Sequence, residues 1–220
     1  MRKVAVILSG CGYQDGGEIQ ETVLSFLVLE QLGIAWEALT LNKAQRKVVN
    51  HRTGAVVEEH RNLLDESARI SRGNIAELRD KSASDFDAVI IPGGFGAALN
   101  LCDFALSGAD MTVEDELRDF LVDVHKQGKP IGAICIAPVI LAKVFGELKP
   151  KLTVGHDTDV GAAMKSWGAE PVDCPVDDCI IDKKHGFVTT PAYMLGPSIL
   201  GVEKGIRKLV ESVVNWGGDS

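Results

Sequence analysis

Short apolar runs alternate with amphipathic stretches along this chain, and this alternation limits its fold more than any other feature. Val4 to Leu8 is a continuous apolar run, which is typical of a strand buried on both faces. Similar runs end at Leu41, Ile91 and Ile134. Strands that alternate with helices predict an α/β fold with a mostly parallel sheet and helices on both faces.

The individual elements follow from apolar periodicity and from the residues that begin and end helices. Thr112 is expected to cap one helix, and Arg52-Thr53-Gly54 is expected to turn a hairpin. The predicted helices cover residues 18–32, 62–72, 112–127, 135–145 and 199–215. The predicted strands cover residues 4–8, 35–41, 87–91, 130–134, 152–154, 179–181 and 188–190, with the hairpin at 48–57.

Length and charge limit the possible classes of protein. The 220 residues are 45% hydrophobic and 25% charged, which fits a single domain, residues 1–220, with a substantial core. The formal net charge of -8 argues against nucleic acid or an anionic membrane as the main partner, since both attract basic surfaces. The sequence has no apolar run long enough for a transmembrane helix, and the apolar run after Met1 is too short for a signal peptide.

The cysteines are odd in number and scattered, which fits reduced thiols in the cytoplasm better than a set of disulfides. Cys174 and Cys179 are interpreted as packed thiols at a turn, because no second pair of residues is spaced for zinc. We therefore expect no metal and a cytoplasmic location. The five cysteines are Cys11, Cys102, Cys135, Cys174 and Cys179.

Cys135 is the residue with the strongest indication of chemistry. An apolar strand leads into it, Ala133 and Ala137 flank it at two residues on each side, and Pro138 follows. Small residues allow a strand and a helix to approach closely at a tight turn, as in a nucleophile elbow. A position near a helix N-terminus favours the thiolate and lowers the thiol pKa. A buried core cysteine is the structural alternative, and we favour the nucleophile.

A glycine-rich loop, Pro92-Gly93-Gly94-Phe95-Gly96, follows another predicted strand. Parallel sheets carry their sites at the carboxyl ends of the strands, so this loop and Cys135 are expected to lie at one crevice. Glycines let backbone N–H groups approach a ligand. The N–H groups of Gly94 and Ile136 are therefore candidate donors to an oxyanion, with Gly93 beside them in the substrate-binding loop.

Glu18 opens the first predicted helix directly after Asp15-Gly16-Gly17. An acid there complements the helix dipole, which is a sufficient structural role. The first strand is often central in such sheets, so its loop is also expected to overhang the crevice of Cys135. Glu18 is then a candidate general acid and base that shares a proton with the thiol.

These motifs together resemble the class I glutamine amidotransferase-like superfamily, and within it the enhancing-lycopene-biosynthesis group of ElbB-type glyoxalases. The resemblance extends over nearly the whole chain. The stretches that carry it are Ile7 to Gly12, Asp15 to Ile19, Pro92 to Ala98, Cys135 to Pro138, Cys174 to Asp178 and Thr189 to Met194.

The resemblance implies a flavodoxin-like three-layer sandwich and a weak, cofactor-free glyoxalase that turns glyoxal into glycolate. It implies that Cys135 is the nucleophile, that Glu18 is the acid/base carboxyl, and that Gly94 and Ile136 supply the oxyanion donors. It also implies a homodimer. In the expected reaction, the thiolate adds to an aldehyde, a proton moves through an enediol, and a thioester is hydrolysed.

The chain departs from the histidine pattern of related hydrolases. Peptidase-like relatives carry a histidine directly after the cysteine, where this chain has Ile136. His156 is a possible substitute from the next strand, although an exposed loop histidine is the favoured interpretation. Without a triad histidine, hydrolysis of glutamine or peptides loses its usual proton shuttle.

Two alternatives to a glyoxalase remain from the sequence: a redox-sensing, chaperone-like or regulatory protein that uses the same cysteine, and an amidotransferase-like hydrolase. Cys11 is a candidate either to support Cys135 from behind or to form a disulfide with it as a resolving thiol, and Tyr193 is a candidate for the pocket wall. NAD binding is not expected, because the glycines after the first strand have the wrong spacing and no acidic residue ends the second.

Overall fold

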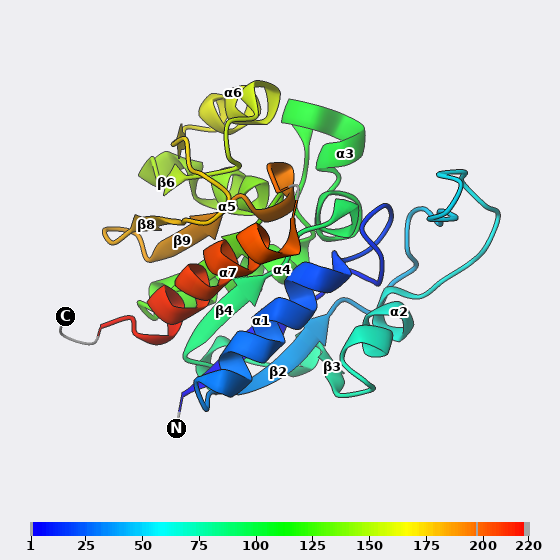
Figure 1. Ribbon diagram of the computed structural model, residues 1–220, viewed down its shortest axis with the longest axis horizontal. Helices are drawn as coiled ribbons and strands as arrows, with labels where there is room; N and C mark the ends of the chain where they lie inside the picture. The colour runs from blue at the N-terminus through cyan, green and yellow to red at the C-terminus, as the bar shows by residue number, and fades with distance from the viewer. Residues whose placement is uncertain (1, 197, 218–220) are drawn as a thin grey trace.

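The structure is a computed structural model that describes residues 2–196 and 198–217 (Figure 1). Its seven-stranded sheet has the order β3-β2-β1-β4-β5-β9-β8. Neighbouring strands run parallel except β8 and β9, which are antiparallel. The strands are β1 (Lys3–Ile7), β2 (Ala35–Thr40), β3 (Ile75–Glu77), β4 (Ala88–Ile91), β5 (Ile131–Ile134), β8 (Ile180–Asp182) and β9 (Phe187–Thr190).

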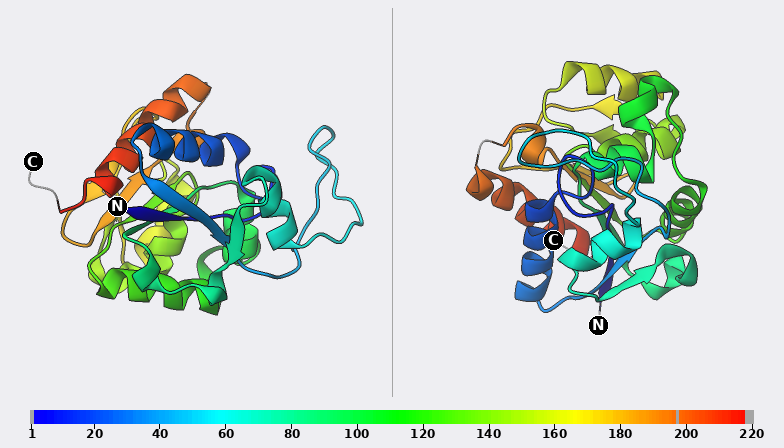
Figure 2. Two further views of the ribbon diagram at one scale, coloured as in Figure 1. Left: turned by 90° about the horizontal axis from the view of Figure 1, so that it is seen from below. Right: turned by 90° about the vertical axis from the view of Figure 1, so that its right-hand side faces the viewer.

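Helices cover both faces of this sheet, as the alternating pattern predicts (Figure 2). A small parallel pair, β6 (Lys151–Leu152) and β7 (Glu170–Pro171), lies outside it. Within the described residues, no helix has the length and apolar character needed to cross a membrane. The helices are α1 (Ile19–Gln31), α2 (Leu63–Ile70), α3 (Phe104–Ser107), α4 (Asp115–Lys126), α5 (Pro138–Phe145), α6 (Thr158–Ser166) and α7 (Ile199–Val214).

The apolar run of β1 supplies both halves of the core. Successive side chains of a strand point to opposite faces of the sheet. Val4 and Val6 therefore pack on one face with α1 and α7, while Ala5 and Ile7 pack on the other with α4 and α5. The result is a three-layer sandwich with two cores, which explains why an unbroken apolar run was needed in the central strands.

The strand order changes direction beside β1. The chain proceeds from β1 to β2 and β3 on one side, and then returns to place β4 on the other side of β1. Loops diverge from such a switch point and leave a crevice at the carboxyl ends of the strands. The segments that follow β1, β4, β5 and β9 all begin at this edge, as the sequence analysis expected for three of them.

Most helix boundaries agree with the predictions. Glu18 is the N-cap of α1, Asn62 is the N-cap of α2, and Pro138 occupies the first turn of α5. The predicted cap Thr112 is wrong: α4 begins after Glu114, and the Thr112 N–H instead donates to Asp103. Sequence patterns did not predict α3, α6, β3 or β7, which are short.

The helix over residues 18–32 is predicted from the spacing of Ile19, Val23, Phe26, Leu27 and Leu29, and this apolar face is wrong in part. Ile19, Val23 and Leu27 are 44 to 47% exposed. The helix instead buries a row that includes Glu21 and Ser25. Apolar spacing alone does not determine which of these two faces of α1 is buried. The packing of α1 against the sheet and α7 determines it.

The predicted hairpin at 48–57 is an isolated contact between Val49 and Val56, not a pair of strands. It belongs to a long connection from β2 to α2 that extends away from the sheet (Figure 1). The Val49 N–H donates to the buried carboxylate of Asp15 at 2.6 Å. This bond ties the connection to the loop after β1.

Gly205 of α7 gives a test of the packing between this helix and β9. A Cβ at this position would lie 2.4 Å from the Val176 carbonyl oxygen and 2.6 Å from the Thr190 hydroxyl. We expect Gly205→Ala to lower the free energy of unfolding by about 1–3 kcal/mol, the usual cost of overpacking. Unfolding in urea measures this change.

Gly161 in α6 is the matched control. A Cβ there would meet only the Pro171 ring, at an ordinary contact distance of 3.8 Å. Alanine favours a helix over glycine by about 1 kcal/mol, so Gly161→Ala should leave stability unchanged or raise it. Equal destabilisation by both substitutions would contradict the packing described for α7.

Candidate active site

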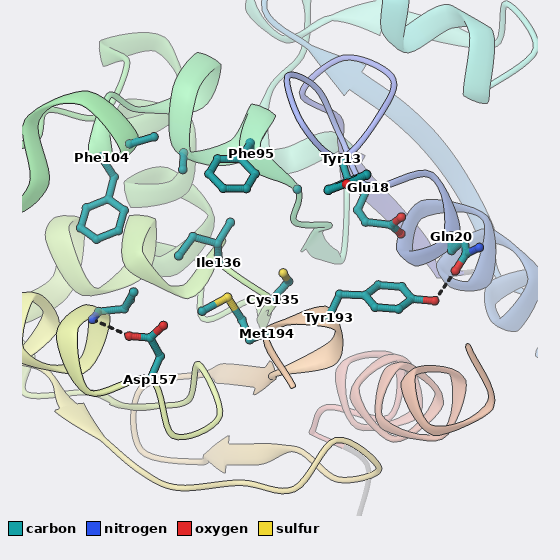
Figure 3. A pocket seen from close by; sticks show the side chains of 14 residues that line it. Tyr13, Glu18, Gln20, Phe95, Phe104, Cys135, Ile136, Asp157, Tyr193 and Met194 are labelled. Carbon is teal, nitrogen blue, oxygen red and sulfur yellow. Dashed lines mark hydrogen bonds between the residues drawn. The ribbon is translucent and has the colours of Figure 1, made fainter. Parts of the chain in front are cut away.

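A cavity of ≈ 700 Å³ opens at the carboxyl ends of the central strands (Figure 3). Loops that follow four strands reach it. They contribute Glu18 after β1, Phe95 after β4, Cys135 after β5 and Tyr193 after β9. The cavity thus lies where the switch in strand order predicts a site.

Cys135 occupies the turn between β5 and α5, at the wall of this cavity. Its backbone has a φ of 61°, which is uncommon for a residue other than glycine and carries a cost in strain. Its N–H donates to the Thr190 carbonyl of the neighbouring strand β9 at 2.9 Å. The residue is only 7% exposed, so the fold holds the thiol in a fixed position.

Glu21, which the sequence analysis did not single out, is the carboxyl that lies beside Cys135, and its negative charge acts on the thiol. Its side chain is fully buried. The Gly93 N–H donates to its Oε2 at 2.8 Å, and the Tyr193 N–H donates to its Oε1 at 3.3 Å. The carboxyl of α1 therefore contacts the turns that follow β4, β5 and β9.

Glu18 lies where it was predicted, at the start of α1 and in the same cavity as Cys135. Its carboxylate accepts the Glu21 N–H at 2.6 Å and caps α1, and its role as general acid and base stays a prediction. The partner of the thiol lies one helical turn further along, at Glu21. The signal for it was a charged residue that shares a helix face with Leu24 and Val28, and that face was not recognised as the buried one.

The backbone of Gly93 lies so close to Cys135 and Glu21 that only glycine fits at this position. A Cβ at Gly93 would lie 2.5 Å from the Cys135 Cβ and 2.9 Å from Glu21 Oε2. No side chain fits there. The Gly93 N–H is already bonded to Glu21, so this group is not an available oxyanion donor.

Two backbone N–H groups lie near the thiol. The N–H groups of Gly94 and Ile136 act to lower the pKa of Cys135, whereas those of Phe95 and Gly96 donate to carbonyls of the loop after β1. The structure therefore brings Cys135, Gly94 and Ile136 together as the sequence analysis expected. The role of these N–H groups toward an oxyanion stays a prediction.

Burial governs the acid–base chemistry of the pair. It raises the pKa of Glu21 to about 8. Burial, and after it the negative charge of Glu21, raises the pKa of the Cys135 thiol well above its usual value, although the Gly94 and Ile136 N–H groups oppose this. The helix terminus alone therefore does not lower the thiol pKa as predicted. The two groups titrate together, and a thiolate is favoured when Glu21 holds the proton.

The remaining predicted residues have separate positions. His156 is exposed, and no histidine is among the described residues that line the cavity. Cys11 is also absent from that lining. It lies near Glu66 and Arg69, and burial raises its pKa. Tyr193 does line the cavity, and its hydroxyl donates to Gln20 (Figure 3).

The described residues hold neither a disulfide nor a metal cluster. All five cysteines are free. Histidine, cysteine and acidic side chains nowhere form a group of three that could hold a metal ion within residues 2–196 and 198–217.

Comparisons with known proteins agree with the predicted superfamily. A model described as the DJ-1/PfpI family matches residues 2–192. The human glutamine amidotransferase-like class 1 domain-containing protein 3, mitochondrial, is 40% identical over 98% of this chain and 84% of its own. The zebrafish ES1 protein, mitochondrial, is 31% identical over 87% of this chain and 76% of its own.

A crystal structure of similar architecture comes from Ehrlichia chaffeensis. It is described as an isoprenoid biosynthesis protein with an amidotransferase-like domain, and it is 34% identical with a TM-score of 0.92. The similarity covers 98% of this chain and 99% of that one. The names of the curated relatives place those proteins in mitochondria, and the cytoplasmic location of this chain stays a prediction.

Glu21 should make stability depend on pH. Its pKa is about 8 in the folded protein against 4.5 for a free side chain, so between these values the folded state keeps a proton that the unfolded state has lost. Its contribution is complete below about pH 4.5 and is lost as pH rises through about 8, on the order of 5 kcal/mol in all. We expect stability to fall with rising pH across this range.

Glu21→Gln is the matched variant, because an amide keeps the shape of the carboxyl and does not titrate. The difference in unfolding free energy between wild type and variant, measured in urea from about pH 5 to pH 9, isolates the contribution of this residue. A difference that is constant with pH would contradict the raised pKa.

Proposed function

This chain belongs to the DJ-1/PfpI family, and from that membership and the surroundings of Cys135 we propose that it is a cofactor-independent glyoxalase. The proposed reaction converts glyoxal to glycolate through a hemithioacetal on Cys135. The single observation that carries the proposal is the pairing of a cavity thiol with a buried, protonatable carboxyl, Glu21. The resemblance to ElbB-type glyoxalases supports the same activity.

Cys135 supplies the nucleophile in this proposal, at a turn that we interpret as a nucleophile elbow. The thiolate sulfur bonds to one aldehyde carbon, and the carbonyl electron pair moves to oxygen. The N–H groups of Gly94 and Ile136 stabilise the charge on that oxygen. The oxygen then takes the proton of Glu21, which leaves a hemithioacetal and a carboxylate.

Glu21 then moves the second proton. Its carboxylate takes the hydrogen from the carbon that bears sulfur, and the electron pair forms an enediol with the adjacent carbonyl. Return of the proton to the adjacent carbon gives a thioester with a neighbouring hydroxyl group. Water cleaves the thioester to release glycolate and restore the thiol. One carbon is oxidised and its neighbour reduced, so the sequence needs no external oxidant.

Three variants test the assignment of roles. Cys135→Ala should abolish turnover, because no covalent adduct forms. Glu21→Gln should lower kcat by about 100- to 10,000-fold, the usual range for a lost general acid or base. Glu18→Gln should cost much less, since the Glu18 carboxylate is engaged as the cap of α1. Production of glycolate from glyoxal, followed by chromatography, is the measurement.

The outcome separates the two glutamates. A greater loss in Glu18→Gln than in Glu21→Gln would move the acid/base role back to Glu18. Equal turnover in wild type and Cys135→Ala would overturn the glyoxalase. Thermal unfolding of each variant checks that the fold is intact.

Redox sensing by Cys135 is the second candidate function. The observation that favours it is the same pair of N–H groups, together with Glu21, around a sulfur that the cavity makes accessible. These groups would also stabilise oxygen atoms added to the sulfur. An amidotransferase-like hydrolase has less support, because no histidine lines the described part of the cavity.

Mild peroxide distinguishes sensing from catalysis. Oxidation to a sulfinate adds two oxygen atoms, about 32 Da, to the peptide that contains Cys135. Cys102 is an internal control, because it is fully buried and burial raises its pKa to about 12. Selective oxidation of Cys135 without turnover of any 2-oxoaldehyde would support the sensor. Equal oxidation of both cysteines would contradict it.

A further inference from the structure

The cavity is much larger than glyoxal requires. Cavities of 300–1,000 Å³ usually enclose drug-sized ligands, and the volume here is ≈ 700 Å³. Glyoxal contains only two carbons and two oxygens, and a molecule of that size leaves most of the cavity to water. The volume therefore indicates a substrate with a substituent on the dicarbonyl group.

The lining indicates what that substituent is. Apart from Cys135 and the polar groups near it, the wall consists mainly of apolar side chains, which include Phe95, Phe104, Ile136 and Met194. Figure 3 shows Ile136, Phe95 and Phe104 on one side of Cys135, and Tyr193 with Gln20 on the other. Phe104 is held in place by an edge-to-face contact with Trp167, with ring centroids 5.9 Å apart.

The charges of the cavity wall argue against substrates that carry a carboxylate or a phosphate. Glu18 and Asp157 are its only charged groups among the described residues, and the described lining has no lysine, arginine or histidine. Each acid accepts hydrogen bonds from N–H groups of the helix it caps, α1 or α6. A carboxylate or phosphate on the substrate would lose its water without gaining a cationic partner.

We propose that this cavity selects neutral 2-oxoaldehydes with a bulky hydrocarbon substituent, which lies against Phe95, Phe104 and Ile136 while Cys135 attacks the aldehyde. The proposal rests on the glyoxalase function above and names its substrate class. Glyoxal is then the smallest molecule that the site can turn over. Burial of the hydrocarbon supplies the binding energy that glyoxal lacks.

The first test compares cyclohexylglyoxal with glyoxal. We expect kcat/KM to be at least tenfold higher for cyclohexylglyoxal, which corresponds to one extra group buried in an apolar pocket. Ala105→Trp places a large ring in the cavity wall and should reduce this ratio. Leu106→Trp is the matched control: it adds an indole to the next residue of α3, which is 66% exposed and outside the described lining. It should leave the ratio unchanged.

The second test measures binding without turnover. Benzaldehyde has no second carbonyl, so its adduct with Cys135 stops at the hemithioacetal. Occupancy is read from protection of Cys135 against alkylation by iodoacetamide. Benzaldehyde should protect at a concentration at least tenfold lower than its para-carboxylate. Asp157→Asn keeps the helix cap and removes one negative charge from the cavity wall. It should therefore reduce the difference in protecting concentration between benzaldehyde and its para-carboxylate.

The two tests fail in different ways. Protection by benzaldehyde with no turnover of any 2-oxoaldehyde would overturn the glyoxalase and leave the selectivity of the cavity intact. Faster turnover of glyoxal than of cyclohexylglyoxal would overturn the substrate class and leave the glyoxalase intact. Equal protection by benzaldehyde and its carboxylate would also overturn the proposed selectivity.

Discussion

The rest of the site depends on one buried carboxyl. Glu21 lies in the first turns of α1, where its oxygens accept the N–H groups of Gly93 and Tyr193 and lie beside Cys135. These contacts join the turns after β4, β5 and β9, which come from distant parts of the sequence. A carboxylate loses much of its hydration when it is buried, so the fold favours the protonated form and keeps an exchangeable proton beside the sulfur.

Close backbone contacts determine which backbone N–H groups near the thiol are engaged in other hydrogen bonds. The loops after β1 and β4 bond to each other through Gly16 and Gly96 at 2.8 Å. A Cβ at Gly94 would lie 2.5 Å from the Glu18 nitrogen, and its φ of 88° is one that glycine adopts readily. With the neighbouring N–H groups committed, the Gly94 and Ile136 N–H groups lie near the thiol. The glycine-rich loop thus contributes to the site through close backbone packing as well as through the N–H group of Gly94.

The sequence predicted those features that depend on residues close together in the chain. The approach of strand and helix at Cys135, the proline in the first turn of α5 and the cap at Glu18 all depend on neighbouring residues. Glu21 depends on which face of α1 is buried, and packing against the sheet and α7 decides that face. The exposure of Ile19 and Val23 shows that apolar spacing alone did not identify the buried face. His156 is exposed, which agrees with the interpretation favoured from the sequence, whereas the position of Cys11 outside the cavity lining follows from tertiary contacts.

A single carboxyl is sufficient for the proposed chemistry, whereas amide hydrolysis needs more. Hydrolysis of glutamine requires protonation of a departing amine, which a histidine normally performs, and the described cavity wall has none. The conversion of a 2-oxoaldehyde instead moves a proton between adjacent carbons of one bound molecule. A group with a pKa of about 8 can both accept and return that proton near neutral pH. Burial raises the pKa of Glu21, and this raised pKa makes the residue suited to the proposed proton transfer.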